Sequence, residues 1–312
     1  MFLANHQNAL LDALLIATHC SRKPYFLTRS DVFKTVLLKV FFEFIQMIPV
    51  YRIRDGRNSL AGNNAIFKRC SELLQGGEAI LIFPEGNHSL KRRVRPLSKG
   101  FTRILFLALE SNPSLDIGII PIGVNYANAA KFPDKAALHY GKEIRVQEFF
   151  DREDLSGSAS RLKSEVYRHI TRLTTHIEEE ADYEDAVYKL DNARVDYLDP
   201  VGVNLVLEKG ASPAHKKIGK GKVGLKKYVF RGIFFILNFS MIILWSKFIK
   251  PKVSELEFLS TTRFMFALVF YPFFYFLIIV VMLTFLNWPT TLIICLAHAT
   301  LNILLVKLWK EG

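Results

Sequence analysis

Three long apolar segments near the end of the chain constrain its fold more than any other feature. Residues 264–286 contain no charged side chain, and residues 229–245 and 288–309 contain one each. About 20 apolar residues in a helix match the ~30 Å hydrocarbon core of a bilayer. Tryptophan, which is typical of membrane interfaces, stands at segment ends: Trp245, Trp288 and Trp309. We therefore expect three membrane-embedded helices, the first of which could re-enter the membrane rather than cross it.

The chain is basic as well as apolar. Half of its residues are hydrophobic, and its formal net charge is +12. This combination suits an anionic membrane surface better than a soluble nucleic-acid-binding fold, and no helix of the kind that reads DNA is recognisable. Four lysines, Lys216, Lys217, Lys220 and Lys222, crowd the approach to the first apolar segment. A basic run of this kind is either a solvated linker or a contact with anionic lipid. Membrane lipids are the expected partners, and nucleic acid is not.

Before residue 150 the sequence alternates between strand and helix patterns. Strand patterns cover residues 24–28, 78–83, 117–122, 136–140 and 144–146, and helix patterns cover residues 10–18, 30–46, 58–75 and 98–109. Such alternation predicts an α/β sheet flanked by helices. After a break at Ser156-Gly157-Ser158, we expect a polar helix capped by Ser160 that ends near Glu180, followed by helical residues from Asp182 to Leu207.

Two short stretches carry residues suited to catalysis. The first is Asn5-His6-Gln7 followed by Asp12, and the second is Phe83-Pro84-Glu85-Gly86-Asn87-His88-Ser89, which ends an apolar strand pattern. A buried strand that ends in a carboxylate and a glycine turn places that carboxylate at the edge of a sheet, where α/β proteins keep their sites. A His–Asp pair can remove a proton from a hydroxyl group.

These stretches resemble the phospholipid/glycerol acyltransferase family. Its third motif matches Phe83-Pro84-Glu85-Gly86 with Ser89, its second resembles residues 48–52, and its fourth resembles Ile120-Pro121-Ile122. The first motif has five residues between His6 and Asp12 instead of the usual four, which is similar to the glycerol-3-phosphate/dihydroxyacetone-phosphate acyltransferase branch. The resemblance covers roughly residues 1–200.

The resemblance implies a role for each matching residue. His6 would be the general base and Asp12 would fix its tautomer. The acceptor phosphate would meet Arg52 at the motif arginine, and Arg54 follows on the same strand face. Glu85 would orient the glycerol part, hold an arginine or cap a turn. Gly86 would allow the turn, and Ser89 would bind the phosphate or the loop. Pro121 would lie in the acyl-donor region, and His88 would be supporting at most. The cluster Lys91, Arg92, Arg93, Arg95 and Lys99 would be mostly solvated, with some members near phosphates.

The implied activity is transfer of a fatty acyl group from an acyl-CoA or acyl carrier protein thioester to glycerol-3-phosphate or dihydroxyacetone phosphate. The alternative acceptor is 1-acylglycerol-3-phosphate, which would give phosphatidic acid. A remote alternative is an inactive lipid-binding membrane protein. No further cofactor is expected, because neither a metal-ligand cluster nor a nucleotide-binding glycine loop is present.

The expected organisation has four parts. Residues 1–155 form the α/β acyltransferase catalytic domain, 156–208 a helical extension, 209–228 a basic linker and 229–309 the membrane helices. The family has chain upstream of the motif histidine, so we expect that the natural beginning could be missing before Phe2. Three distant cysteines read as reduced thiols in a cytosolic setting or in lipid. Lysines and arginines flank the first apolar segment on both sides, so the positive-inside rule does not decide its orientation. We expect an integral membrane protein with its catalytic domain on the cytoplasmic face.

Overall fold

The computed structural model describes residues 1–30, 40, 42–51, 57–209 and 225–311. The chain divides into two compact units. Unit 1 comprises residues 1–126 and 136–215, and unit 2 comprises residues 127–135 and 216–312.

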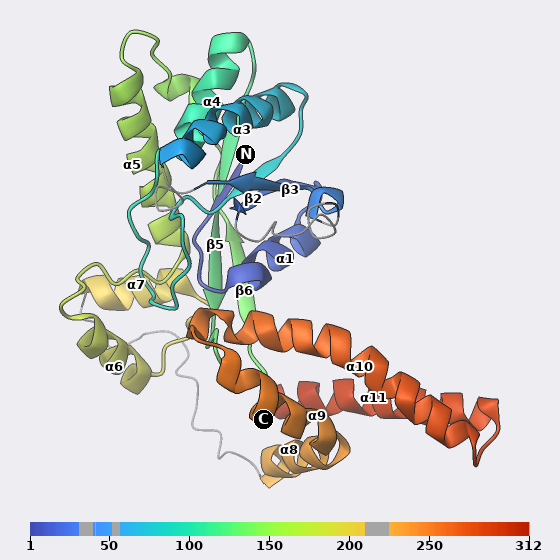
Figure 1. Cartoon of the computed structure of the whole chain (residues 1–312). Coiled ribbons are helices and arrows are strands. Elements are labelled where there is room, and N and C mark those ends of the chain that lie inside the picture. The colour runs from blue at the N-terminus through green and yellow to red at the C-terminus, as the bar shows by residue number, and fades with distance from the viewer. Residues whose placement is uncertain (31–39, 41, 52–56, 210–224, 312) are drawn as a thin grey trace. The chain divides into compact units, whose positions relative to one another are not determined.

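Unit 1 is built on a seven-stranded mixed sheet (Figure 1). Its strands are β1 (Phe2–Ala4), β2 (Tyr25–Arg29), β3 (Met47–Val50), β4 (Ile80–Ile82), β5 (Gly118–Tyr126), β6 (Ala136–Tyr140) and β7 (Ile144–Arg145). Their order is β3-β2-β4-β1-β5-β6, and β7 also pairs with β5. The first five strands in this order run parallel, whereas β6 and β7 are antiparallel to β5. The expected mixed α/β sheet is confirmed.

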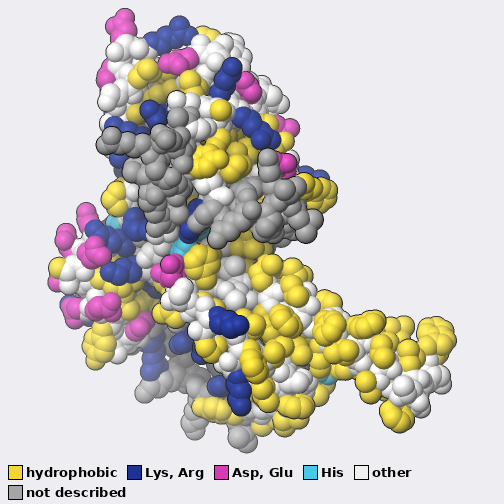
Figure 2. All heavy atoms as spheres, in the orientation of Figure 1, with side chains coloured by type: hydrophobic (Ala, Val, Ile, Leu, Met, Phe, Trp, Pro, Cys, Tyr) yellow, Lys and Arg dark blue, Asp and Glu magenta, His cyan; other side chains and the backbone are white. Residues whose placement is uncertain are grey.

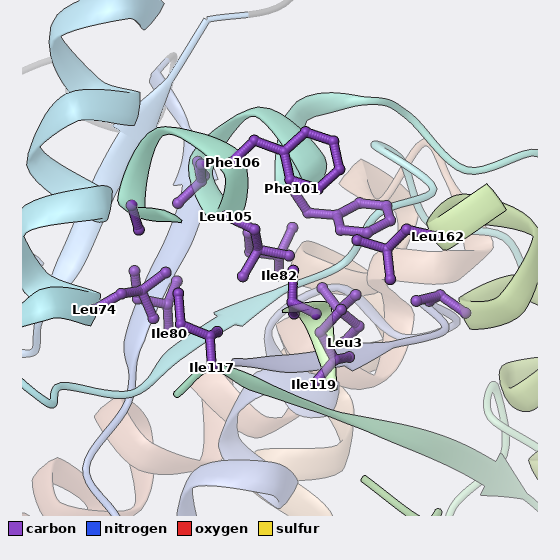
Figure 3. Close-up of a cluster of buried hydrophobic side chains, with 14 of the residues drawn as sticks. Leu3, Leu74, Ile80, Ile82, Phe101, Leu105, Phe106, Ile117, Ile119 and Leu162 are labelled. Atoms are coloured by element: carbon purple, nitrogen blue, oxygen red, sulfur yellow. The ribbon is translucent and has the colours of Figure 1, made fainter. Parts of the chain in front are cut away.

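Helices flank this sheet. They are α1 (Ala9–His19), α3 (Arg57–Gln75), α4 (Gly100–Ser111), α5 (Leu155–Leu173), α6 (Tyr183–Ala193) and α7 (Pro200–Lys209). Apolar residues of α3, α4 and α5 form one buried cluster with alternate strand residues such as Leu3, Ile80 and Ile82 (Figure 3). Leu81, which points to the opposite face by strand alternation, is also buried, so both faces of the central strands are covered.

Three expected helix boundaries in unit 1 are wrong. Helix α5 ends at Leu173, not near Glu180. Helix α5 begins at Leu155, not at Ser160, because Asp154 is the cap and its carboxylate accepts the backbone N–H of Gly157. The Ser-Gly-Ser segment is therefore part of the first turns. The expected helix over 182–207 is two helices, since Arg194 ends α6 in the left-handed conformation with φ 53° and a new helix begins at Pro200. The expected helix over 30–46 falls mostly outside the described residues.

Unit 2 contains the apolar helices. They are α8 (Leu225–Leu237), α9 (Phe239–Leu244), α10 (Leu259–Leu283) and α11 (Trp288–Glu311), with short irregular helical turns between α9 and α10. Two helical stretches, Leu256–Leu283 and Trp288–Trp309, are long and apolar enough to cross a membrane. Hydrophobic side chains cover α10 and α11 on the face shown in Figure 2.

The first expected membrane helix is broken. Tyr228–Leu237 and Phe239–Lys252 meet at an angle of 86°, so together they form one broken span or a re-entrant loop. Asn238, which is fully buried, lies at the break. Its side chain binds the hydroxyl of Tyr271 at 2.8 Å and the amide of Asn302 at 2.7 Å. A polar side chain at the bend is therefore bonded to both long apolar helices.

A histidine extends this network. The hydroxyl of Tyr275 lies 2.8 Å from Nδ1 of His298, and Nε2 of His298 lies 3.2 Å from the carbonyl oxygen of Leu237. Asn302 approaches the same Nδ1 at 3.3 Å. These side chains, with Asn238 and Tyr271, are called the helix network below.

Candidate active site

The sequence-predicted residues His6 and Glu85 follow neighbouring parallel strands. His6 lies two residues after the end of β1, and Glu85 lies three residues after the end of β4, which pairs with β1 in parallel. Strand β5, which pairs with the other edge of β1, ends at Tyr126. The carboxyl ends of three adjacent parallel strands therefore meet here, which is the usual place for a site in an α/β protein.

His6 and Asp12 are in direct contact despite the five residues between them. Nδ1 of His6 lies 2.8 Å from Oδ2 of Asp12. The carboxylate is fully buried, and the imidazole is 15% exposed. Because an ionised carboxylate only accepts hydrogen bonds, Nδ1 carries the ring hydrogen and Nε2 presents its lone pair. This is the tautomer that a general base needs.

Local backbone geometry holds Asp12 in place. It lies in the first turn of α1, and its Oδ2 also accepts the backbone N–H groups of Gln7 at 2.7 Å and Asn8 at 2.8 Å. The helix begins at Ala9, whose φ of 27° is left-handed and costs an alanine on the order of 1 kcal/mol. The chain thus makes a tight turn between His6 and Asp12 and brings the two side chains together.

Glu85 links the loop after β4 to the loop after β1. Its Oε1 accepts the backbone N–H of His6 at 3.2 Å, and its Oε2 accepts Nε of Arg95 at 2.8 Å. Burial raises the pKa of Glu85, and the ion pair with Arg95 opposes that rise. A second guanidinium nitrogen of Arg95 donates to the carbonyl oxygen of Asn87. Glu85 therefore holds an arginine, one of the three roles open to it from the sequence.

The remaining residues of this loop surround His6. Phe83 stacks on the imidazole with ring centroids 4.1 Å apart, and His88 meets it edge-on at 5.6 Å. Gly86 has φ +72°, a conformation in which a side chain would be strained. The N–H of Ser89 donates to the carbonyl oxygen of His6 at 3.0 Å. The structure thus places Gly86 at a tight turn and Ser89 against the loop of His6.

The basic residues after this loop are engaged within unit 1. Lys91 and Arg93 both contact Glu180, at 2.9 and 3.0 Å. Arg92 stacks on the ring of Tyr197 at 3.4 Å from its centroid. Arg95 is the partner of Glu85. These contacts attach the segment to the chain around α6 and α7.

Three further predicted residues are Arg52, Arg54 and Pro121. Arg52 and Arg54 lie outside the described residues. Pro121 is buried inside β5, opposite Leu3 of β1. Among the residues that the structure describes, no group of three or more His, Cys, Asp or Glu side chains is arranged to hold a metal ion.

Sequence reasoning missed Tyr126. Its hydroxyl donates to Oδ1 of Asp12 at 2.7 Å, and both residues are buried. The sequence signal that could have found Tyr126 is its position: it ends the apolar strand that contains the Ile120-Pro121-Ile122 motif. Asn5 reinforces this junction, since its side chain exchanges two hydrogen bonds with the backbone of Val124, at 2.7 and 3.0 Å.

The site residues fall within, or one residue beyond, a segment that matches a known family model. The model, described as acyltransferase, matches residues 1–125. The chain is 27% identical over 178 residues to glycerol-3-phosphate O-acyltransferase 2 of Saccharomyces cerevisiae, an alignment that covers 56% of this chain and 24% of that protein. It is 28% identical over 83 residues to glycerol-3-phosphate O-acyltransferase 1 of the same yeast, covering 27% of this chain and 11% of that protein.

The chain thus spans about a quarter, or less, of the length of these curated relatives. Among solved structures, it is similar to the 1-acyl-sn-glycerophosphate (LPA) acyltransferase PlsC of Thermotoga maritima, with 18% identity and a TM-score of 0.36 over 54% of this chain and 63% of that one. Residues 1–125 of this chain therefore match the acyltransferase family model, and both yeast proteins that the chain resembles are named as acyltransferases.

Proposed function

We propose that the chain is a membrane-bound O-acyltransferase that moves a fatty acyl group from an acyl thioester to a phosphorylated glycerol. The observation that carries this proposal is the 2.8 Å contact between His6 Nδ1 and the buried carboxylate of Asp12. Because Nδ1 carries the ring hydrogen in this contact, Nε2 is the basic nitrogen. The side chain of His6 is 15% exposed. General-base catalysis needs such a nitrogen within reach of the acceptor hydroxyl.

The reaction requires no covalent enzyme intermediate. The acceptor hydroxyl oxygen attacks the thioester carbonyl carbon while its proton passes to Nε2 of His6. Asp12 stabilises the imidazolium ion that forms. As the carbon–sulfur bond breaks, the proton passes from His6 to the departing sulfur. The products are an ester and a free thiol, and His6 returns to its starting state.

The phosphate of the acceptor needs cations. Arg52 and Arg54 are proposed for this role from their motif position, and guanidinium groups suit a phosphate because they donate two parallel hydrogen bonds. Glu85 would act on the glycerol hydroxyls or hold Arg95 toward them. Pro121 is proposed to lie beneath the acyl donor, which would be acyl-CoA or acyl carrier protein. The thioester is a co-substrate, and no resident cofactor is proposed.

Glycerol-3-phosphate, with dihydroxyacetone phosphate as its close analogue, is the proposed acceptor. Its support is the alignment with two proteins named glycerol-3-phosphate O-acyltransferases. The second candidate is 1-acylglycerol-3-phosphate. It is favoured by the two helices long enough to cross a bilayer, because they would hold the catalytic unit where an acylated acceptor resides. We place the catalytic unit on the cytoplasmic face.

The test uses the full chain purified in lipid nanodiscs with an acyl-CoA or acyl carrier protein thioester. Free thiol release is followed with glycerol-3-phosphate, dihydroxyacetone phosphate, 1-acylglycerol-3-phosphate or no acceptor, and the lipid product is identified by mass spectrometry. We expect acceptor-dependent thiol release that His6→Ala lowers on the order of 10²–10⁴-fold. Use of the 1-acyl acceptor alone would assign the second candidate. Lipid binding without thiol release from either donor would overturn the proposal in favour of an inactive lipid-binding protein.

A further inference from the structure

The carboxylate of Asp12 is bonded unevenly at its two oxygens. Oδ2 lies 2.7–2.8 Å from three donors, which are Nδ1 of His6 and two backbone N–H groups. Oδ1 accepts the hydroxyl of Tyr126 at 2.7 Å. Asp12 is fully buried and Tyr126 is 5% exposed. Without the tyrosine hydroxyl, Oδ1 would be a buried charged oxygen that has lost this charge-assisted hydrogen bond.

Resting on the proposed function, we propose that Tyr126 is a positioning residue that tunes the His6–Asp12 pair for proton transfer. Its hydroxyl draws charge toward Oδ1 and holds the plane of the carboxylate, so that Oδ2 faces Nδ1 of His6. Tyr126 acts through Asp12, and its hydroxyl is bonded to the carboxylate rather than to the reacting atoms.

Tyr126 is itself held from two directions. It ends β5, the strand that pairs with β1 immediately before His6. Its carbonyl oxygen accepts a guanidinium N–H of Arg92 at 2.9 Å, and Arg92 stacks on Tyr197. The position of the hydroxyl is thus set by the sheet and by the chain between α6 and α7, rather than by the loop that carries His6. The hydrogen bond from Tyr126 to Asp12 therefore fixes the geometry of the His6–Asp12 pair independently of the loop that carries His6.

Loss of the hydroxyl has a defined effect on the pH dependence of the reaction. Catalysis requires Asp12 to be ionised and His6 to be neutral. With one donor fewer, the carboxylate either holds a proton itself or attracts the proton on His6 more strongly. Both changes displace the acidic limb of the pH–rate profile to higher pH. The other charged or titratable groups around the pair are unaltered by the substitution: Glu85, His88, Arg92 and Arg95.

The first experiment compares wild type with Tyr126→Phe and with Tyr188→Phe in nanodiscs. Tyr188, on α6, is the control because it is 67% exposed. We expect Tyr126→Phe to lower kcat about 10- to 100-fold, the range of one hydrogen bond to a charged group, with the acceptor KM unchanged and the acidic limb displaced upward. Tyr188→Phe should leave kcat and the acidic limb unchanged.

A variant that preserves shape excludes a merely structural effect. Incorporation of 3-fluorotyrosine at position 126 keeps the contact and strengthens the hydroxyl as a donor, so the acidic limb should move downward. In a His6→Ala background, Tyr126→Phe should cause no additional loss, because residues that act through one another are not additive. Two results would overturn the inference. One is a lowered kcat while the acidic limb stays in place in both Tyr126→Phe and the 3-fluorotyrosine variant. The other is an additive loss from Tyr126→Phe in the His6→Ala background.

An activity-independent readout separates this inference from the proposed function. The titration of the His6 ring can be followed by NMR of histidine-labelled protein, with its signal assigned by comparison with His6→Gln. The midpoint should be higher in Tyr126→Phe than in wild type. An inactive wild-type protein that shows this displacement would reject the acyltransferase proposal and retain the role of Tyr126. An unmoved midpoint would overturn the role of Tyr126 whatever the activity.

Discussion

Two regions of the molecule combine histidine with tyrosine, and their partners give the two histidines opposite tautomers. In the candidate site, Nδ1 of His6 donates to the carboxylate of Asp12 at 2.8 Å, which leaves the lone pair on Nε2. In the helix network, Nε2 of His298 donates to the carbonyl oxygen of Leu237, and Nδ1 accepts from Tyr275. Only the first arrangement leaves a ring nitrogen able to take a substrate proton.

The difference follows from the charge of the partners. Asp12 is an ionisable carboxylate that can stabilise a protonated imidazole, whereas the helix network consists of neutral amides, phenols and a backbone carbonyl. Hydrogen bonds among these neutral groups join the helices to one another, but they leave no ring nitrogen free to accept a further proton. We therefore interpret the first network as a proton relay and the second as an interhelical lock.

The largest effect is expected from removing the two histidines in turn. His6→Ala should lower kcat on the order of 10²–10⁴-fold, the contribution of a general base. His298→Ala should leave kcat near the wild-type value, because no proton transfer passes through His298. Thiol release at saturating substrate measures both. A comparable loss of kcat in folded His298→Ala protein would end the distinction between relay and lock.

The next effect concerns the ion pair beside His6. Arg95→Met leaves the buried carboxylate of Glu85 without its charged partner. We expect a destabilisation of about 2 kcal/mol, below the usual cost of breaking a buried pair because Arg95 is partly exposed. Unfolding of the full chain monitored by hydrogen exchange in unit 1 measures it.

A second substitution supplies the control for Arg95. Burial raises the pKa of Glu85, so the unpaired side chain in Arg95→Met should gain a proton at higher pH than in wild type. Glu85→Gln in the Arg95→Met background removes the uncompensated charge and should restore most of the stability. If the double variant is no more stable than Arg95→Met, the cost comes from lost packing of Arg95 rather than from the charge of Glu85.

A smaller effect is expected in the helix network. Tyr275→Phe removes the hydroxyl at 2.8 Å from His298 and should cost about 1 kcal/mol, the scale of hydrogen bonds between membrane helices, without changing kcat. All three tryptophans lie at positions 245, 288 and 309, so denaturation followed by tryptophan fluorescence reports on unit 2. Tyr228, which is 61% exposed, provides the control as Tyr228→Phe. Equal effects of the two substitutions would remove the interhelical role of Tyr275.

The sequence predicted the parts of the site that depend on local order. Strand ends followed by His6 and by Glu85 could be recognised because an apolar run and a glycine turn are adjacent in the chain, and the parallel pairing of β4 with β1 brings them together. Tyr126 was not recognised because it lies 114 residues from Asp12. Its contact depends on the pairing of β1 with β5, which no short motif encodes.

Predicted helix boundaries were wrong where the hydrogen bonds of one side chain determine where a helix begins or breaks. Ser160 has a plausible capping sequence, but Asp154 already accepts the N–H of Gly157 and begins the helix earlier. The first apolar segment reads as one span because Asn238 is one of a few isolated polar residues in an apolar run. Its hydrogen bonds to Tyr271 and Asn302 belong to tertiary structure, so the 86° bend is not visible in composition.

The smallest effect tests whether the hydrogen-bond partner also sets the protonation state of a third histidine, His176. Its Nδ1 accepts the backbone N–H of Val94 at 3.0 Å, which requires a neutral ring. Burial lowers the pKa of His176 from its ordinary value of 6.5. As pH falls below 6.5, the unfolded chain therefore binds a proton that the folded chain resists, and stability declines with decreasing pH.

His176→Asn keeps an acceptor near the position of Nδ1 but cannot titrate. We expect the melting temperature of wild type to fall more steeply than that of His176→Asn between about pH 6.5 and 5. His169→Asn, at a partly exposed histidine that contacts Glu165, controls for the loss of one titratable ring. Parallel melting curves for wild type and His176→Asn would show that the contact with Val94 does not depend on the neutral ring.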